Sequence, residues 1–160
     1  MNKFIKSERG VSLLELLTAM PILSILMISL TVLLGFGIKS YLFVLSDWEM
    51  QREVEFTMES IQHDLMYAKS ADIVSGQLII TNQSAKSIIP ETTTYELTSG
   101  SNPHITRNAQ PMTGDTKLSN INILKFMLRR HSEKTIFYNI EAENALTGHR
   151  YELRSATTYP

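Results

Sequence analysis

Glu15 is the side chain in the N-terminal part of the chain whose type and position could do chemistry. It lies five residues after Gly10 and is the last charged residue before Lys39. A bare carboxylate deep in a membrane-spanning helix costs about 3 kcal/mol. Glu15 therefore either lies at the membrane–water interface or has a specific cationic partner.

The segment that must position Glu15 is an apolar run long enough to cross a membrane. Leu16–Ile38 contains 23 residues and no charge. At 1.5 Å per residue, a helix of this length spans about 35 Å, slightly more than the roughly 30 Å of a hydrocarbon core. A secretory signal peptide has a shorter apolar region, of roughly 7–15 residues, that ends at a small-residue cleavage site. The sequence therefore predicts a transmembrane helix and not a signal peptide.

The residues around Gly10 resemble the N-terminal motif of type IV prepilins and type II secretion pseudopilins. The matching run is Arg9-Gly10-Val11-Ser12-Leu13-Leu14-Glu15-Leu16-Leu17, after a short basic leader. The resemblance implies that a membrane-bound prepilin peptidase cuts between Gly10 and Val11 and that the new amine of Val11 is methylated. It also implies that Glu15 is the family glutamate and that the helix anchors the subunit before it packs into a filament.

The same resemblance implies the partners of the chain: other pilin or pseudopilin subunits, the prepilin peptidase and methyltransferase, an inner-membrane assembly platform, and membrane lipid. After cleavage, Glu15 would lie four residues from the amine of Val11, on the same helical face. An ion pair between them, within one subunit or between neighbours, would neutralise the carboxylate and set the axial register. Val11 stands where the family usually has phenylalanine. Pro21 lies early in the span, where proline tends to kink a helix.

The leader carries an excess of positive charge, because Lys3, Lys6 and Arg9 outnumber Glu8. Positive segments next to a membrane span stay in the cytoplasm. The chain is therefore predicted to be a single-pass membrane protein, with a cytoplasmic N-terminus and an extracytoplasmic C-terminal domain. The resemblance to prepilins implies that this membrane is the inner membrane and that the assembled chain lies in a pilus or pseudopilus. There are no cysteines, so no disulfide can staple that domain.

Four regions are predicted. Residues 1–10 form the cytoplasmic leader, 11–38 the transmembrane and assembly helix, 39–70 an amphipathic continuation of the helix, and 71–160 a β-rich extracytoplasmic domain. The continuation is indicated by apolar residues that recur at three- and four-residue steps. These residues are Met50, Val54, Met58, Ile61, Leu65 and Ala68. The predicted fold is α+β, with a long helix packed on a small antiparallel sheet, which the resemblance makes pilin-like.

The segment after Asp72 has the short β-type runs expected of strands. The predicted strands are Gln77–Thr81, Lys86–Ile89, Thr93–Leu97, Ile121–Leu128, Thr135–Ala142 and Arg150–Ser155. Thr98–Lys117 is polar and too long for a bare loop, so a short strand is expected near His104–Arg107. Asn144–His149 contains Leu-Thr-Gly and is predicted to be the turn of a C-terminal hairpin.

Catalytic and metal-binding patterns are missing from the sequence. The histidines are scattered, and no nucleophile motif, cysteine or metal-ligand spacing accompanies them. We expect no enzymatic activity, no cofactor and no metal site, and the charge distribution predicts no specific nucleic-acid binding. His63 and Asp64 are expected to be solvated residues with diverging side chains. The basic cluster Arg129-Arg130-His131 is expected to be a strand end that meets water.

Several features of the second half resemble J-type minor pseudopilins and PilW-like minor pilins. They are Trp48-Glu49-Met50, Val54–Ile61, Tyr95-Glu96-Leu97, Ile105-Thr106-Arg107 and Tyr151-Glu152-Leu153. The resemblance implies a low-copy subunit that initiates a filament or occupies its tip. The function expected from the sequence is a minor pilin or pseudopilin, a structural subunit of a type IV pilus or a type II secretion pseudopilus. The alternative is a single-pass membrane-anchored binding module that does not polymerise.

Overall fold

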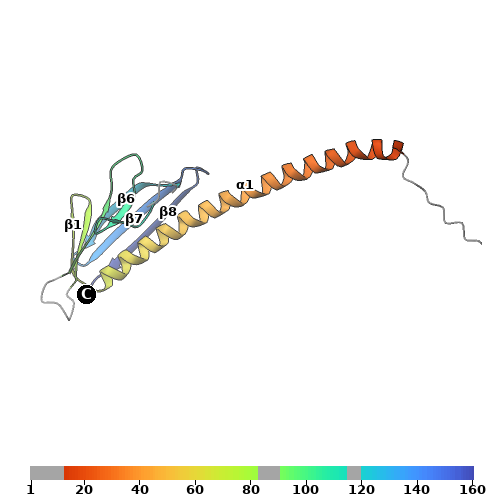
Figure 1. Cartoon of the computed structure of the whole chain (residues 1–160). Coiled ribbons are helices and arrows are strands. Elements are labelled where there is room, and N and C mark those ends of the chain that lie inside the picture. Colours follow the sequence, from red (N-terminus) through yellow and green to blue (C-terminus); the bar gives the residue numbers. More distant parts are fainter. Residues whose placement is uncertain (1–12, 83–90, 115–119) are drawn as a thin grey trace, which may run out of the picture. The chain divides into compact units, whose positions relative to one another are not determined.

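The chain has an α+β fold with one long N-terminal helix. A computed structural model describes residues 13–82, 91–114 and 120–160. Within them, helix α1 (Leu13–Met66) precedes eight β-strands. The chain divides into two compact units, Met1–Leu42 and Phe43–Pro160. The second unit contains the C-terminal part of α1 and all of the strands (Figure 1).

The first five strands form an antiparallel sheet, sheet A, in chain order. They are β1 (Ala68–Val74), β2 (Gln77–Asn82), β3 (Glu91–Leu97), β4 (Ile105–Arg107) and β5 (Gln110–Pro111). Strands β1 and β2 are joined by Ser75-Gly76, which has φ angles of 52° and 84°. Positive φ at both central residues is the geometry of a type I′ hairpin turn, whose twist matches that of the flanking strands.

The last three strands form a second antiparallel sheet, sheet B. They are β6 (Ile121–Ser132), β7 (Thr135–Asn144) and β8 (Arg150–Thr158), with β7 in the centre. Alternate residues of β7, including Ile136, Tyr138 and Ile140, have fully buried side chains. Because successive side chains of a strand point to opposite faces, sheet B has a core face and an outer face.

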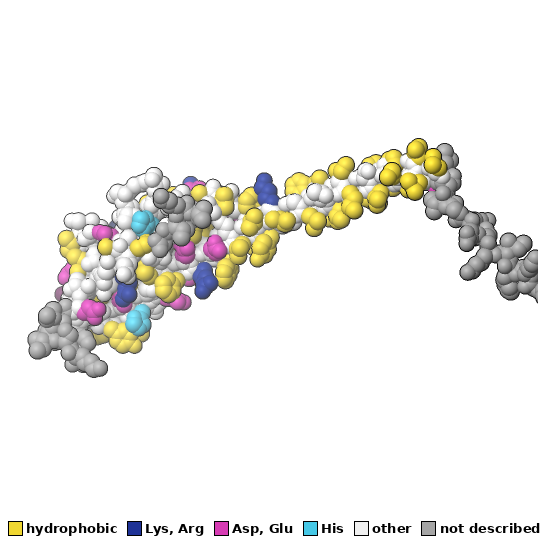
Figure 2. Space-filling model, in the orientation of Figure 1, with side chains coloured by type: hydrophobic (Ala, Val, Ile, Leu, Met, Phe, Trp, Pro, Cys, Tyr) yellow, Lys and Arg dark blue, Asp and Glu magenta, His cyan; other side chains and the backbone are white. Residues whose placement is uncertain are grey.

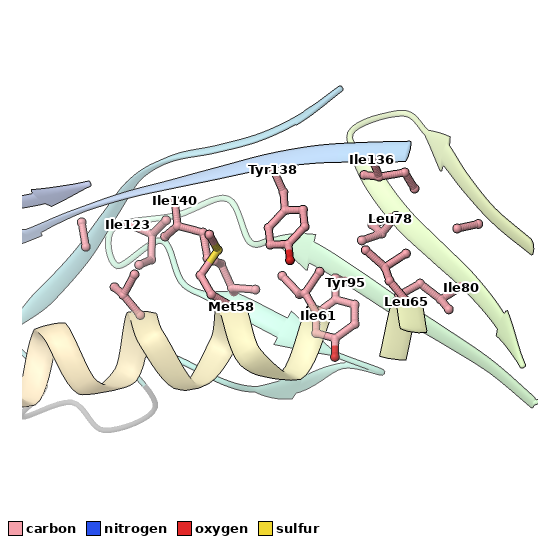
Figure 3. Close-up of a cluster of buried hydrophobic side chains, with 14 of the residues drawn as sticks. Met58, Ile61, Leu65, Leu78, Ile80, Tyr95, Ile123, Ile136, Tyr138 and Ile140 are labelled. Atoms are coloured by element: carbon pink, nitrogen blue, oxygen red, sulfur yellow. The ribbon is translucent and has the colours of Figure 1, made fainter. Parts of the chain in front are cut away.

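The core of the second unit lies between α1 and the two sheets, as Figure 3 shows. The helix contributes Met50, Val54, Met58, Ile61 and Leu65, each at most 4% exposed. Sheet A contributes Leu78, Ile80, Tyr95 and Ile105, and sheet B contributes Ile123, Ile136, Tyr138 and Ile140. The apolar stripe predicted for this helix is therefore the stripe that is buried.

The structure differs from the sequence prediction at the end of the helix and in the number of sheets. Helix α1 ends at Met66 and β1 begins at Ala68, so residues 68–70 are strand and not helix. The Ser75-Gly76 turn allows β1 to pair with β2, with a register that runs from Ala71↔Ile80 to Val74↔Gln77. This pairing favours a strand over a helix in the residues before the turn. Two sheets replace the single predicted sheet.

Most of the other predicted strands are present in the structure. Strands lie in five of the six predicted runs, while Lys86–Ile89 is outside the described residues. The short strand expected near His104–Arg107 is β4, and β7 and β8 flank the predicted hairpin turn. Helix α1 continues through Pro21.

Candidate functional site

The N-terminal motif is described only from Leu13 onward. Gly10 and Val11 lie outside the described residues, so the predicted cleavage point and ion pair have no geometry here. Glu15 lies in the first described turn of α1, and it is exposed. The positive end of a helix dipole lies at its N-terminus, and a carboxylate in the first turn is stabilised there by about 0.3–1 kcal/mol.

The segment that follows Glu15 has an apolar surface on every side. All residues from Leu16 to Leu42 are exposed, and Figure 2 shows hydrophobic side chains covering this part of the helix. The most apolar 18-residue window of α1 has a mean hydropathy of 2.3, and none of it is buried. By length and composition, α1 contains a candidate membrane span.

The polar side chains inside this apolar segment donate hydrogen bonds to their own helix. The hydroxyls of Ser24, Ser29 and Thr31 bind the carbonyl oxygens four residues earlier, at 2.9, 2.9 and 2.8 Å. The hydroxyl of Thr18 donates to the carbonyl oxygen of Glu15 at 3.0 Å. A hydroxyl with an internal acceptor loses little on entering hydrocarbon, where an unpaired polar group is costly. These residues therefore fit a lipid or a helix-packing environment.

In the second unit, the main polar contact between α1 and sheet A centres on Asp64. Its carboxylate accepts a hydrogen bond from the hydroxyl of Tyr95 (2.7 Å). It also accepts bonds from Nε and Nη2 of Arg107, at 3.1 and 3.2 Å. Asp64 is only 6% exposed, and Tyr95 is fully buried. The network ties the last turns of α1 to strands β3 and β4.

This network corrects the prediction that His63 and Asp64 are both solvated with diverging side chains. His63 is exposed, but its Nδ1 lies 3.6 Å from the carboxylate of Asp64, which is buried. Burial, together with the neighbouring Asp64 carboxylate, raises the pKa of Tyr95 well above its usual value of 10. Tyr95 is therefore neutral at physiological pH and remains a hydrogen-bond donor.

A second polar cluster joins α1 to the β7–β8 turn. Asp47 accepts hydrogen bonds from Nδ2 of Asn144 (2.7 Å) and the hydroxyl of Thr147 (2.6 Å), and its other oxygen lies 2.5 Å from Nδ1 of His149. Burial alone would raise the pKa of Asp47, but the hydrogen bonds from Thr147 and His149 outweigh it and the pKa is lowered. The turn is predicted from the sequence but this contact is not, because the partners are about a hundred residues apart.

The structure separates the three residues of the predicted basic cluster. Arg130 donates to the carbonyl oxygen of Ala71 and pairs with Asp72 at 2.9 Å, so it joins sheet B to strand β1. Arg129 and His131 instead line a hollow on the outer face of sheet B, together with apolar side chains. All three residues are exposed at the end of β6, as predicted, and Arg130 in addition makes a structural contact with strand β1.

Within residues 13–82, 91–114 and 120–160, no group of three or more histidine or acidic side chains is placed to hold a metal ion. A comparison of the chain with protein-family models, curated proteins and solved structures finds no match.

Proposed function

We propose that the chain is a minor pilin or pseudopilin, made as a precursor and assembled through its N-terminal helix. The observation that carries the proposal is the prepilin-type run from Arg9 to Leu17 at the start of a long apolar helix. The exposed apolar surface of residues 16–38 supports it, because such a surface needs either lipid or other helices around it. We propose that the α+β fold is accordingly pilin-like, a long helix carrying an antiparallel β-rich domain.

Glu15 is assigned a role in assembly. The amine that cleavage creates at Val11 would lie one helical turn away, which allows an ion pair in one subunit or with a neighbour. In hydrocarbon, an intersubunit pair fixes the stagger of adjacent helices, since other staggers leave charges unpaired. The self-satisfied hydroxyls of Ser24, Ser29 and Thr31 impose no competing polar requirement.

A minor pilin or pseudopilin has a defined orientation in the membrane and defined protein partners. The excess of cations in the leader favours a cytoplasmic N-terminus, so that the peptidase, methyltransferase and assembly platform meet the chain at the inner membrane. Residues 43–160 then lie outside the cytoplasm. A low-copy role in initiation, or at the filament tip, rests on the resemblance of the second half to J-type pseudopilins.

The second candidate function is a single-pass membrane-anchored binding module that does not polymerise. The observation that favours it is the self-contained second unit, Phe43–Pro160, whose core residues all lie at or after Met50. Such a unit could act alone on a simple tether. The two candidates differ in the fate of the leader, because a simple tether keeps it.

Intact-mass measurement of the protein from its native membrane tests the proposal. The expected mass corresponds to loss of residues 1–10 and one methyl group on the amine of Val11. A Gly10→Leu variant should retain the full precursor mass and remain in the membrane fraction. A Pro21→Ala variant is the control, because it also alters the N-terminal region but leaves the cleavage motif intact. A wild-type chain that still begins at Met1 in peptidase-positive cells would refute the proposal and favour the tether.

A further inference from the structure

The outer face of sheet B is unusually apolar at one end. The register places Arg129 of β6, Phe137 of β7 and Ala156 of β8 in one row across the sheet. Met127 pairs with Asn139 in the adjacent row and points to the same face. A solvated sheet face normally carries polar side chains, whereas Phe137, Ala156 and Met127 in these two neighbouring rows give this end of the face a small apolar patch.

These side chains form a hollow with a volume of about 330 Å³. Its lining consists of Met127, Arg129, His131, Phe137 and Ala156. The register of β6 shifts between Arg130 and Ser132, which is the mark of a β-bulge, and His131 lies at this bulge. Arg129 and His131 lie two residues apart on β6, so the alternation of side chains along a strand directs both to the face that carries the hollow. The volume is at the small end of ligand pockets, enough for one or two side chains.

The hollow carries a positive charge, the guanidinium of Arg129, that is not in an ion pair with a described residue. The other arginines of sheet B are engaged: Arg130 with Asp72, Arg150 with Glu143 and Arg154 with Glu152. Arg129, by contrast, has no acidic partner within the described parts of the chain. An exposed guanidinium beside an apolar floor complements a carboxylate that is attached to an apolar group.

We propose that this hollow binds an acidic, hydrophobic segment of a partner protein. An aliphatic side chain of that segment lies on Phe137 and Ala156, and the carboxylate of the neighbouring residue pairs with the guanidinium of Arg129. A peptide segment fits better than a larger ligand, because the hollow is small and lies beside edge strand β6. The proposal concerns the second unit alone and does not depend on processing or membrane insertion.

The experiment uses the full chain in neutral detergent micelles, with ¹³C-labelled methionine and alanine methyl groups. The probe is acetyl-leucyl-aspartyl-leucine amide, and the matched control probe is acetyl-leucyl-asparaginyl-leucine amide, which lacks only the charge. NMR titration should shift the methyl resonances of Met127 and Ala156 saturably. The asparaginyl probe should need about fivefold higher concentration, as expected for one partly exposed ion pair.

Three variants sharpen the test. Arg129→Gln should weaken binding of the aspartyl probe about fivefold and remove its advantage over the asparaginyl probe. Arg154→Gln is the matched control, since that arginine lies on the same face but pairs with Glu152, and it should bind as wild type. Ala156→Leu should narrow the hollow and weaken binding of both probes, with the methyl resonances outside the hollow unchanged.

Four results would overturn the proposal: no saturable shift, equal affinity for both probes, wild-type affinity in Arg129→Gln, or shifts centred elsewhere on the chain. A further arm replaces the probe with phosphatidylglycerol in the micelles. If the lipid shifted Met127 and Ala156 in an Arg129-dependent manner and the peptide did not, a lipid headgroup would be the ligand, and the protein-partner proposal would fail.

Discussion

Replacing Asp64 with alanine tests whether one buried carboxylate holds α1 on sheet A. The change removes the acceptor for the Tyr95 hydroxyl and for two nitrogens of Arg107. Tyr95 is fully buried, so its hydroxyl would be left without its partner in the core. The Arg107 side chain is 43% exposed, so its guanidinium can turn to water instead.

These two contributions set the expected loss of stability. A buried hydroxyl without a partner costs about 1–3 kcal/mol, and an exposed ion pair contributes about 0–1 kcal/mol. Asp64→Ala should therefore lower the free energy of unfolding by about 1–4 kcal/mol. Tyr95→Phe should cost less, because Asp64 keeps Arg107. In the Tyr95→Phe background, Asp64→Ala should become milder, with a coupling energy of about 1–2 kcal/mol.

The assay is urea unfolding of the fragment Phe43–Pro160, which contains every core residue and is expected to fold alone. Asp72→Ala is the control, since it removes the same group from an ion pair whose acidic side chain is 68% exposed. It should cost less than about 1 kcal/mol. If Asp64→Ala were no more destabilising than Asp72→Ala, or showed no coupling to Tyr95, the network would not hold the helix.

Three further outcomes are expected from the same fragment. Because the pKa of Tyr95 is raised in the folded state, its protonated hydroxyl stabilises the fold fully below the unfolded pKa near 10, and this stabilisation is lost as pH rises above that value. The free energy of unfolding should therefore fall less steeply with alkaline pH in Tyr95→Phe than in wild type. The lowered pKa of Asp47 gives stability that is present above about pH 4 and lost as pH falls; acid titration of Asp47→Asn should show a smaller loss than wild type. Gly76→Val, at a φ of 84°, should destabilise the β1–β2 turn by at least about 1 kcal/mol in thermal unfolding, whereas Gln77→Val should not.

Local patterns predicted most of the elements. The stripe from Met50 to Leu65 repeats at helical spacing, and its burial follows because no other face of that helix is as apolar. Strand β1 was missed, although Ser75-Gly76 between apolar runs is a two-residue hairpin signal.

The polar contacts could not be predicted, because they join residues far apart in sequence. Asp64 meets Tyr95 and Arg107 from 31 and 43 residues away, and a carboxylate is ordinarily expected in water. The hollow at Arg129 likewise depends on the register that sets Arg129, Phe137 and Ala156 side by side. Register follows from the folded sheet and is not readable from each strand alone.

Crosslinking between subunits tests the assembly role of the N-terminal helix most directly. A photo-crosslinking amino acid replaces Leu17 in the full chain, which is expressed in the native host and irradiated in intact membranes. With Glu15 present, the processed chain is expected to crosslink to other prepilin-type subunits. Glu15→Ala should remain in the membrane and be processed, since the change makes the span more apolar, but it should lose these crosslinks.

Ser24→Ala is the control. In the structure, the hydroxyl of Ser24 donates to the carbonyl oxygen of Met20 in the same helix, so its removal should leave crosslinking at the wild-type level. Wild-type crosslinking in Glu15→Ala, or crosslinks to lipid alone in the wild-type chain, would contradict assembly through this helix.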